Sequence, residues 1–130
     1  MKKIAYLTLA VLLVVATLVG CTNASDVKIF GKDDKDITVS VGERFMIQLQ
    51  ENPTTGYAWS FTISNKGAVY LFDNKFDENS TDTLVSGSGG MRNLTFKGKS
   101  KGTSTITFIY ERSGGKNPKD EVIVYNVTVE

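Results

Sequence analysis

Apolar and polar residues alternate with a period of two along most of the chain after residue 26. Ile37, Val39 and Val41, for example, are separated by Thr38 and Ser40. Alternation of this kind places one face of a strand on a core and the other toward water, and β-branched and aromatic residues suit strands. The pattern predicts strands over residues 27–30 with 37–41, 44–50, 57–63, 68–76, 91–97, 103–111 and 121–129.

Short strands separated by frequent turns predict an all-β fold, an immunoglobulin-like β-sandwich of about seven antiparallel strands. The first two segments are interpreted as one interrupted edge strand. If successive strands run antiparallel, the connections 51–56, 77–90 and 112–120 lie together at one end of the sandwich. Because these connections are long or unusual in composition while the turns at the other end are short, we expect a binding surface there.

The first twenty residues form a separate segment. Lys2 and Lys3 precede an apolar run from Ile4 to Val19, which predicts an export signal rather than a permanent membrane span. The run ends in Leu-Val-Gly-Cys at 18–21, which resembles a bacterial-type lipoprotein signal whose Cys is acylated. The alternative is an ordinary secretory signal with a free thiol. Because Cys21 is the only cysteine, lipidation would explain an otherwise odd residue.

These features divide the chain into a signal peptide at 1–20, a small polar tether at 21–26 and one sandwich domain at 27–130. The domain is long enough to bury a core of its own, and we expect a monomer. We expect the protein outside the cytoplasm, anchored to the cell membrane through lipid on Cys21. Thr22 after the cysteine favours the outer membrane or its periplasmic face where a cell has one.

Charge and composition argue against several classes of function. Lys and Arg total 15 against 14 Asp and Glu, so no concentrated basic face is expected for nucleic acid. The chain has no His, and its single thiol is the proposed lipid site, which removes the commonest general base and nucleophile. The acidic segment 33–36 lacks the glycine and final glutamate of a calcium loop. We therefore expect no enzymatic activity, no metal and no cofactor.

The segment 52–57, called the wedge below, has the composition of a stiff turn. Asn52 can cap the turn with its side chain, Pro53 fixes φ, and Gly56 can adopt a positive φ. Thr54 and Thr55 are small and have few rotamers. The wedge is predicted to present short hydroxyl-bearing side chains and to lose little entropy on binding. A plain hairpin turn is the alternative, although turn chemistry does not require two adjacent threonines at an exposed tip.

The other two connections carry weaker signals. Gly87-Ser88-Gly89-Gly90 exposes backbone groups that could pair with an extended groove, although its spacing alone favours a flexible linker. The segment 112–118 holds Arg112 and Lys116 and is typical of a solvated hairpin tip.

Together these segments resemble the chagasin family (I42) of inhibitors of papain-like cysteine proteases, whose members are immunoglobulin-like sandwiches. The family's Asn-Pro-Thr-Thr-Gly-Tyr/Phe-x-Trp segment is matched by 52–59, and its Gly-x-Gly-Gly segment by 87–90. The resemblance extends from about Val27 to Glu130. The family's third motif, Arg-Pro-Trp, is matched only at Arg112, because Ser113 and Gly114 stand in place of Pro and Trp. The missing aromatic side chain removes a stacking surface, which bears on affinity and target range.

The resemblance implies reversible, competitive inhibition of papain-like cysteine proteases. The wedge would enter the active-site cleft with Thr54 and Thr55 nearest the catalytic cysteine, and the other two loops would flank it. Trp59 is expected in the core beneath the wedge, where it would brace the loop, whereas Tyr57 could serve the core or the interface. The alternative is a lipid-anchored adhesion or ligand-binding sandwich without a protease target. The protease-binding residues implied are Asn52, Pro53, Thr54, Thr55, Gly56, Tyr57, Gly87, Ser88, Gly89, Gly90 and Arg112.

Overall fold

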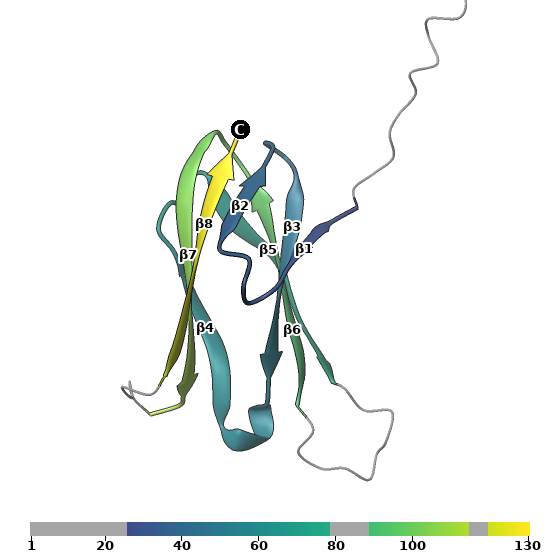
Figure 1. The fold of residues 1–130 in the computed structure, drawn as a ribbon, viewed down its shortest axis with the longest axis vertical. Helices are drawn as coiled ribbons and strands as arrows, with labels where there is room; N and C mark the ends of the chain where they lie inside the picture. The colour runs from purple at the N-terminus through teal and green to yellow at the C-terminus, as the bar shows by residue number, and fades with distance from the viewer. Residues whose placement is uncertain (1–25, 79–88, 115–119) are drawn as a thin grey trace, which may run out of the picture.

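The computed structural model describes residues 26–78, 89–114 and 120–130, which form two four-stranded sheets packed face to face (Figure 1). The first sheet has the order β1 (Lys28–Phe30), β3 (Arg44–Glu51), β6 (Gly90–Gly98) and β5 (Val69–Glu78). The second has the order β2 (Asp36–Val39), β8 (Glu121–Val129), β7 (Gly102–Arg112) and β4 (Tyr57–Ile63). This arrangement confirms the predicted immunoglobulin-like sandwich.

The predicted interrupted edge strand is divided between the two sheets. β1 pairs in parallel with the first half of β3, and β2 pairs in parallel with β8. Gly31 fixes the crossing between them, because its N–H donates to Asp34 Oδ2 at 2.8 Å and its carbonyl accepts from the Tyr125 hydroxyl at 2.9 Å. The two halves have the same alternating pattern, so the sequence alone does not reveal that they belong to different sheets.

The core lies between the sheets and is built from the inward-facing residues that the alternation predicts. Phe45 and Phe96 stack with ring centroids 5.6 Å apart, and Phe108 meets Tyr125 edge to face at 5.7 Å. Full burial of one such side chain contributes about 1.5–3 kcal/mol to folding. The other fully or almost fully buried apolar residues on the strands are Ile37, Val39, Ile47, Leu49, Val69, Leu94, Ile106, Ile123, Val127 and Val129.

The three unusual connections begin and end at one end of the sandwich, the lower end in Figure 1. β3 leads into a single 3-10 turn, Pro53–Thr55, which is followed directly by β4. Glu78 at the end of β5 pairs with Gly90 at the start of β6, and Tyr110 near the end of β7 pairs with Glu121 at the start of β8. The prediction that these three connections share one end of the sandwich is therefore confirmed.

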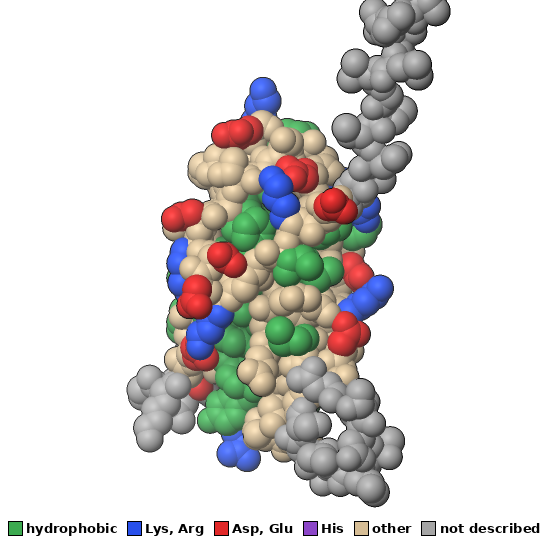
Figure 2. All heavy atoms as spheres, turned by 45° about the vertical axis from the view of Figure 1, so that its right-hand side comes forward, with side chains coloured by type: hydrophobic (Ala, Val, Ile, Leu, Met, Phe, Trp, Pro, Cys, Tyr) green, Lys and Arg blue, Asp and Glu red, His purple; other side chains and the backbone are tan. Residues whose placement is uncertain are grey.

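Within the described residues, no helix is long and apolar enough to cross a membrane, and no group of His, Cys, Asp or Glu is arranged to hold a metal ion. Residues 1–25, with Cys21, lie outside the described part of the chain. On the face drawn in Figure 2, acidic and basic side chains are interspersed rather than gathered by sign.

Candidate functional site

The wedge is held in one conformation by hydrogen bonds within its own few residues. Asn52 caps the 3-10 turn, since its Oδ1 accepts from the N–H of Thr54 at 3.2 Å. The N–H of Gly56 donates to the carbonyl of Pro53 at 3.0 Å, and Gly56 ends the turn with φ at 80°. Only glycine adopts that φ readily, which explains its place after the two threonines. The prediction of a capped, stiff turn is confirmed.

The threonine hydroxyls of the wedge do not simply point outward, as the sequence suggested. Thr54 Oγ1 donates to Asn52 Oδ1 at 2.6 Å, and Thr55 Oγ1 donates to the Asn52 carbonyl at 2.7 Å. Both residues remain exposed, but each hydroxyl already has a partner inside the turn. The hydroxyl donors at the tip are therefore already paired, so that covering them by another surface would carry little desolvation penalty.

Aromatic side chains support the wedge from below. Trp59 lies on the inward face of β4, packs against the buried core and donates its indole N–H to the carbonyl of Gln50 at 2.8 Å. Its ring is 4.8 Å from that of Tyr110, which in turn is 5.5 Å from the ring of Tyr57. The expected bracing role of Trp59 is confirmed, and Tyr57 joins the same half-buried stack.

Tyr110 is a supporting residue that sequence reasoning missed. Its hydroxyl accepts a hydrogen bond from the N–H of Asn52 at 3.0 Å, so β7 holds the first residue of the wedge. The only signal in the sequence was an aromatic residue with a polar end two positions before Arg112. Such a residue is equally common in an ordinary core, and only the three-dimensional structure distinguishes the two roles.

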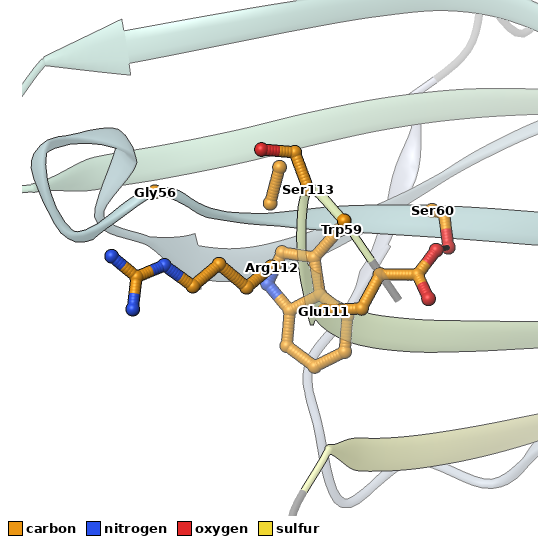
Figure 3. A pocket seen from close by; sticks show the side chains of 8 residues that line it. Gly56, Trp59, Ser60, Glu111, Arg112 and Ser113 are labelled. Carbon is orange, nitrogen blue, oxygen red and sulfur yellow. Dashed lines mark hydrogen bonds between the residues drawn. The ribbon is translucent and has the colours of Figure 1, made fainter. Parts of the chain in front are cut away.

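Arg112 lies next to the wedge, although it is 56 positions from Gly56 in the sequence. It pairs with Tyr57 in the β4–β7 ladder, and a Cβ placed on Gly56 would be 3.4 Å from its Nε. Figure 3 shows the exposed guanidinium extending on the side of the wedge. The structure thus brings one predicted residue of the third loop against the predicted residues of the first.

Gly89 and Gly90 have a packing role that the sequence did not indicate. A Cβ on Gly89 would lie 2.7 Å from the carbonyl oxygen of Glu51, and a Cβ on Gly90 would lie 2.2 Å from that of Asp77. Neither position accepts a side chain without movement of the backbone. Gly89 therefore allows a close approach to the wedge, and Gly90 allows a close approach to β5. Their predicted partners in the motif, Gly87 and Ser88, lie outside the described residues.

A surface hollow of about 350 Å³ lies where the chain departs from the Arg-Pro-Trp pattern. Ser113 and Gly114 line one side of it, and Ala58 and Trp59 line another. Figure 3 shows Glu111 beside Ser60, whose hydroxyl is 2.9 Å from the Glu111 carboxylate. Gly114 has φ at 122°, a conformation that residues with side chains rarely adopt, so the backbone here does not suit a Trp at that position.

Comparison with known proteins identifies the family of this chain. Residues 38–129 match the family model for the chagasin family of peptidase inhibitors, I42. The chain belongs to the chagasin family. Chagasin from Trypanosoma cruzi is 33% identical over 95 residues, which cover 68% of this chain and 84% of that protein. Amoebiasin-1 from Entamoeba histolytica is 30% identical over 94 residues, covering 72% of this chain and 89% of that protein.

The crystal structure of the cysteine protease inhibitor EhICP2 from Entamoeba histolytica has a TM-score of 0.69 to this chain. The two are 25% identical, and the match covers 80% of this chain and 96% of that one. Members of the chagasin family are peptidase inhibitors and not enzymes, so the expectation that this protein has no catalytic activity is confirmed.

Proposed function

We propose that this chagasin-family protein is a reversible, competitive inhibitor of papain-like cysteine proteases and that the wedge occupies the active-site cleft. The observation that carries the proposal is the self-contained hydrogen bonding of the wedge around Asn52. A turn already fixed in its bound shape loses little conformational entropy on entering a cleft. Family membership and the similarity to EhICP2, described as a cysteine protease inhibitor, support the target class.

The same geometry accounts for inhibition without cleavage. A protease must hold its substrate extended across the catalytic groups, with the scissile carbonyl within reach of the nucleophile. The backbone of Pro53–Thr55 instead forms a closed 3-10 turn whose carbonyls at Asn52 and Pro53 accept hydrogen bonds from Thr55 and Gly56. The wedge would therefore fill the cleft while offering no extended peptide bond.

The two neighbouring connections would flank the cleft. Arg112 stands beside Gly56 and would supply a charged contact at one side. Gly89, directly before β6, lies against the carbonyl of Glu51, at the end of the strand that leads into the wedge. The proposed protease-binding set thus remains the wedge, residues 87–90 and Arg112.

The experiment is a titration of the domain, residues 22–130, against papain while hydrolysis of a fluorogenic peptide is followed. Competitive loss of activity at sub-micromolar inhibitor is expected. Replacing both Thr54 and Thr55 with Glu should abolish inhibition, because charge and bulk at the tip cannot enter a narrow cleft. A control with Thr62→Glu and Thr103→Glu, on exposed positions of β4 and β7, should inhibit as the parent does. Equal inhibition by the wedge variant would rule out this mode of binding.

We also propose that the protein is an extracytoplasmic lipoprotein anchored through Cys21. In support, Asp26 lines a hollow with Gly42 and Glu43, which lie at the β2–β3 turn, opposite to the wedge. An anchor entering there would leave the wedge facing away from the membrane. Metabolic labelling with an alkyne fatty acid should tag the full-length chain but not its Cys21→Ala variant. Equal labelling of both would contradict the assignment of the lipid to this residue.

A further inference from the structure

Glu51, directly before the wedge, has a buried carboxylate that the inhibitory surface does not itself use. Only 1% of the residue is exposed. Its Oε2 accepts from the backbone N–H of Trp59 at 2.9 Å, and its Oε1 accepts from Arg92 Nε at 3.1 Å and Nη2 at 2.5 Å. A buried carboxylate with every oxygen satisfied is an uncommon and costly feature, so its position calls for a reason.

The hydrogen bond from Trp59 joins the two sheets. β3 and β4 lie in different sheets, and among the strands that the structure describes β4 is an edge strand paired with β7 alone. Within the described residues, the Trp59 N–H lies on the side of β4 that has no neighbouring strand. It donates its hydrogen bond to the Glu51 carboxylate. The bond therefore fixes the separation of the two strands that carry the wedge, one residue before it begins and two residues after it ends.

The ion pair with Arg92 extends this link to β5 and β6. Arg92 lies on β6, two residues after Gly90, and its Nη1 donates to Asn74 Oδ1 on β5 at 3.3 Å. Its guanidinium also lies 5.1 Å from the ring centroid of Phe76, again on β5. One carboxylate thus connects, directly or through Arg92, the four strands β3, β4, β5 and β6.

Stability alone does not explain such a pair. Replacing both partners of a buried ion pair with apolar residues of similar size is often neutral or stabilising, because desolvation offsets most of the attraction. An ion pair with several directed hydrogen bonds fixes the mutual orientation of the groups that it joins. An apolar cluster does not.

We infer that Glu51 is a positioning residue of the inhibitory surface, which sets the wedge and the start of β6, at Gly89 and Gly90, in a fixed relation so that both fit one cleft. The inference rests on the proposed function, and it assigns Glu51 no contact with the protease. Rigid loops bind more tightly because less motion is lost on association. The contribution of Glu51 therefore belongs to the free inhibitor and is already present before the protease arrives.

The deciding variant replaces both members of the pair, Glu51→Leu with Arg92→Met, so that no unpaired charge remains buried. It is expected to keep the urea midpoint of the parent domain or to exceed it. Its inhibition constant for papain is expected to rise at least about tenfold, because loops that move relative to one another lose entropy on binding. An inhibition constant equal to that of the parent, in a folded double variant, would overturn the inference.

A matched control separates positioning from general loss of stability. Val127→Ala removes two buried methyl groups from β8, in the half of the core remote from the wedge, and lowers the urea midpoint without touching the pair. The inhibition constant of this control is expected to stay that of the parent. If it rises as much as that of the double variant, inhibition tracks stability and the positioning role is lost.

Hydrogen exchange of the free protein tests Glu51 independently of any protease. In the double variant, the amides of Trp59 and of Thr54 to Gly56 are expected to exchange faster, while those of β8 keep their rates. Unchanged exchange at Trp59 would overturn the inference even if inhibition were weaker. If the parent domain fails to inhibit papain, the proposed function fails on that result, whereas the exchange rates still decide whether Glu51 fixes the loops.

Discussion

The two ends of this sandwich are closed by different chemistry. At the end that carries the wedge, the space between the sheets holds Glu51 with Arg92 and the half-buried rings of Trp59 and Tyr110, all tied by hydrogen bonds. At the opposite end, buried aliphatic side chains meet beneath short turns. The buried side chains at that end are those of Ile37, Val39, Val69, Val127 and Val129. Gly98 also lies there, and a Cβ on it would be 2.9 Å from the Ser40 carbonyl oxygen.

This difference shows how one domain separates stability from the placement of a binding surface. Apolar contacts are non-directional and supply most of the folding free energy. Hydrogen bonds contribute less to net stability but fix distance and angle. The apolar end thus anchors the fold, and the polar end sets where the loops stand, so changes at the two ends should affect stability and inhibition in different proportions.

The largest expected effect on stability is at the apolar end. Ile37→Ala removes a side chain that is 1% exposed and leaves a cavity, which should lower the free energy of unfolding by about 2–5 kcal/mol. Chemical denaturation monitored by circular dichroism measures this loss. The folded fraction should still inhibit papain with the inhibition constant of the parent. A parallel weakening of inhibition would mean that the two ends are not separable.

A change at the polar end should affect both properties. Gly89→Ala places a Cβ against the carbonyl of Glu51 and imposes a φ of 29° on a residue that resists it. Strain of this kind costs roughly 1–3 kcal/mol and should push the start of β6 away from the wedge. We expect a lower denaturation midpoint together with a clearly higher inhibition constant. Loss of stability without loss of inhibition would show that this approach serves packing alone.

Tyr110→Phe should change inhibition more than stability. The substitution keeps the stacked ring but removes the acceptor for the N–H of Asn52. One hydrogen bond contributes about 0.5–1.5 kcal/mol, so only a small shift of the midpoint is expected. The inhibition constant should rise several-fold because the wedge is released from β7. Phe61→Leu is the control, because Phe61 lies on β4 and packs against the buried core. If the two variants inhibit equally, the Tyr110 hydroxyl has no part in positioning.

The smallest effect concerns the turn at the apolar end. The N–H of Ser40 donates to the Glu43 carboxylate and, with help from Lys28, lowers the pKa of that carboxyl below its usual value of 4.5. The ionised form is therefore favoured in the folded state, so its stabilisation is present above about pH 4.5 and is lost as the pH falls through the lower folded-state pKa. Glu43→Gln should flatten the dependence of thermal stability on pH in this acidic range and leave inhibition at neutral pH unchanged. If the thermal stability of the variant still depends steeply on pH in this range, other carboxyl groups cause that dependence.

Much of the fold follows from local patterns that a reader of the sequence can see. The inward positions of β8, from Ile123 to Val129, and the cap by Asn52 both follow from short-range rules on alternation and turn chemistry. The order of the strands along the chain likewise predicts that the three unusual connections lie at one end.

The features that the sequence concealed all depend on contacts between distant segments. Glu51 and Arg92 are 41 positions apart, and Asn52 and Tyr110 are 58 apart. The burial of Glu51 does not follow from any local pattern, because carboxylates are rarely buried unless they are paired. Gly89 and Gly90 were typical of a linker, and only the nearby carbonyls of Glu51 and Asp77 show why a side chain is excluded.

The pairing of β2 with β8 has a consequence for how the protein is made. Ile37 lies opposite Val127, so an edge of the second sheet cannot form until the last nine-residue strand has been synthesised. Contacts between the two ends of a chain slow folding, because a large loop must close before they form. Closure of this edge requires β8, which is compatible with the export predicted from residues 1–20.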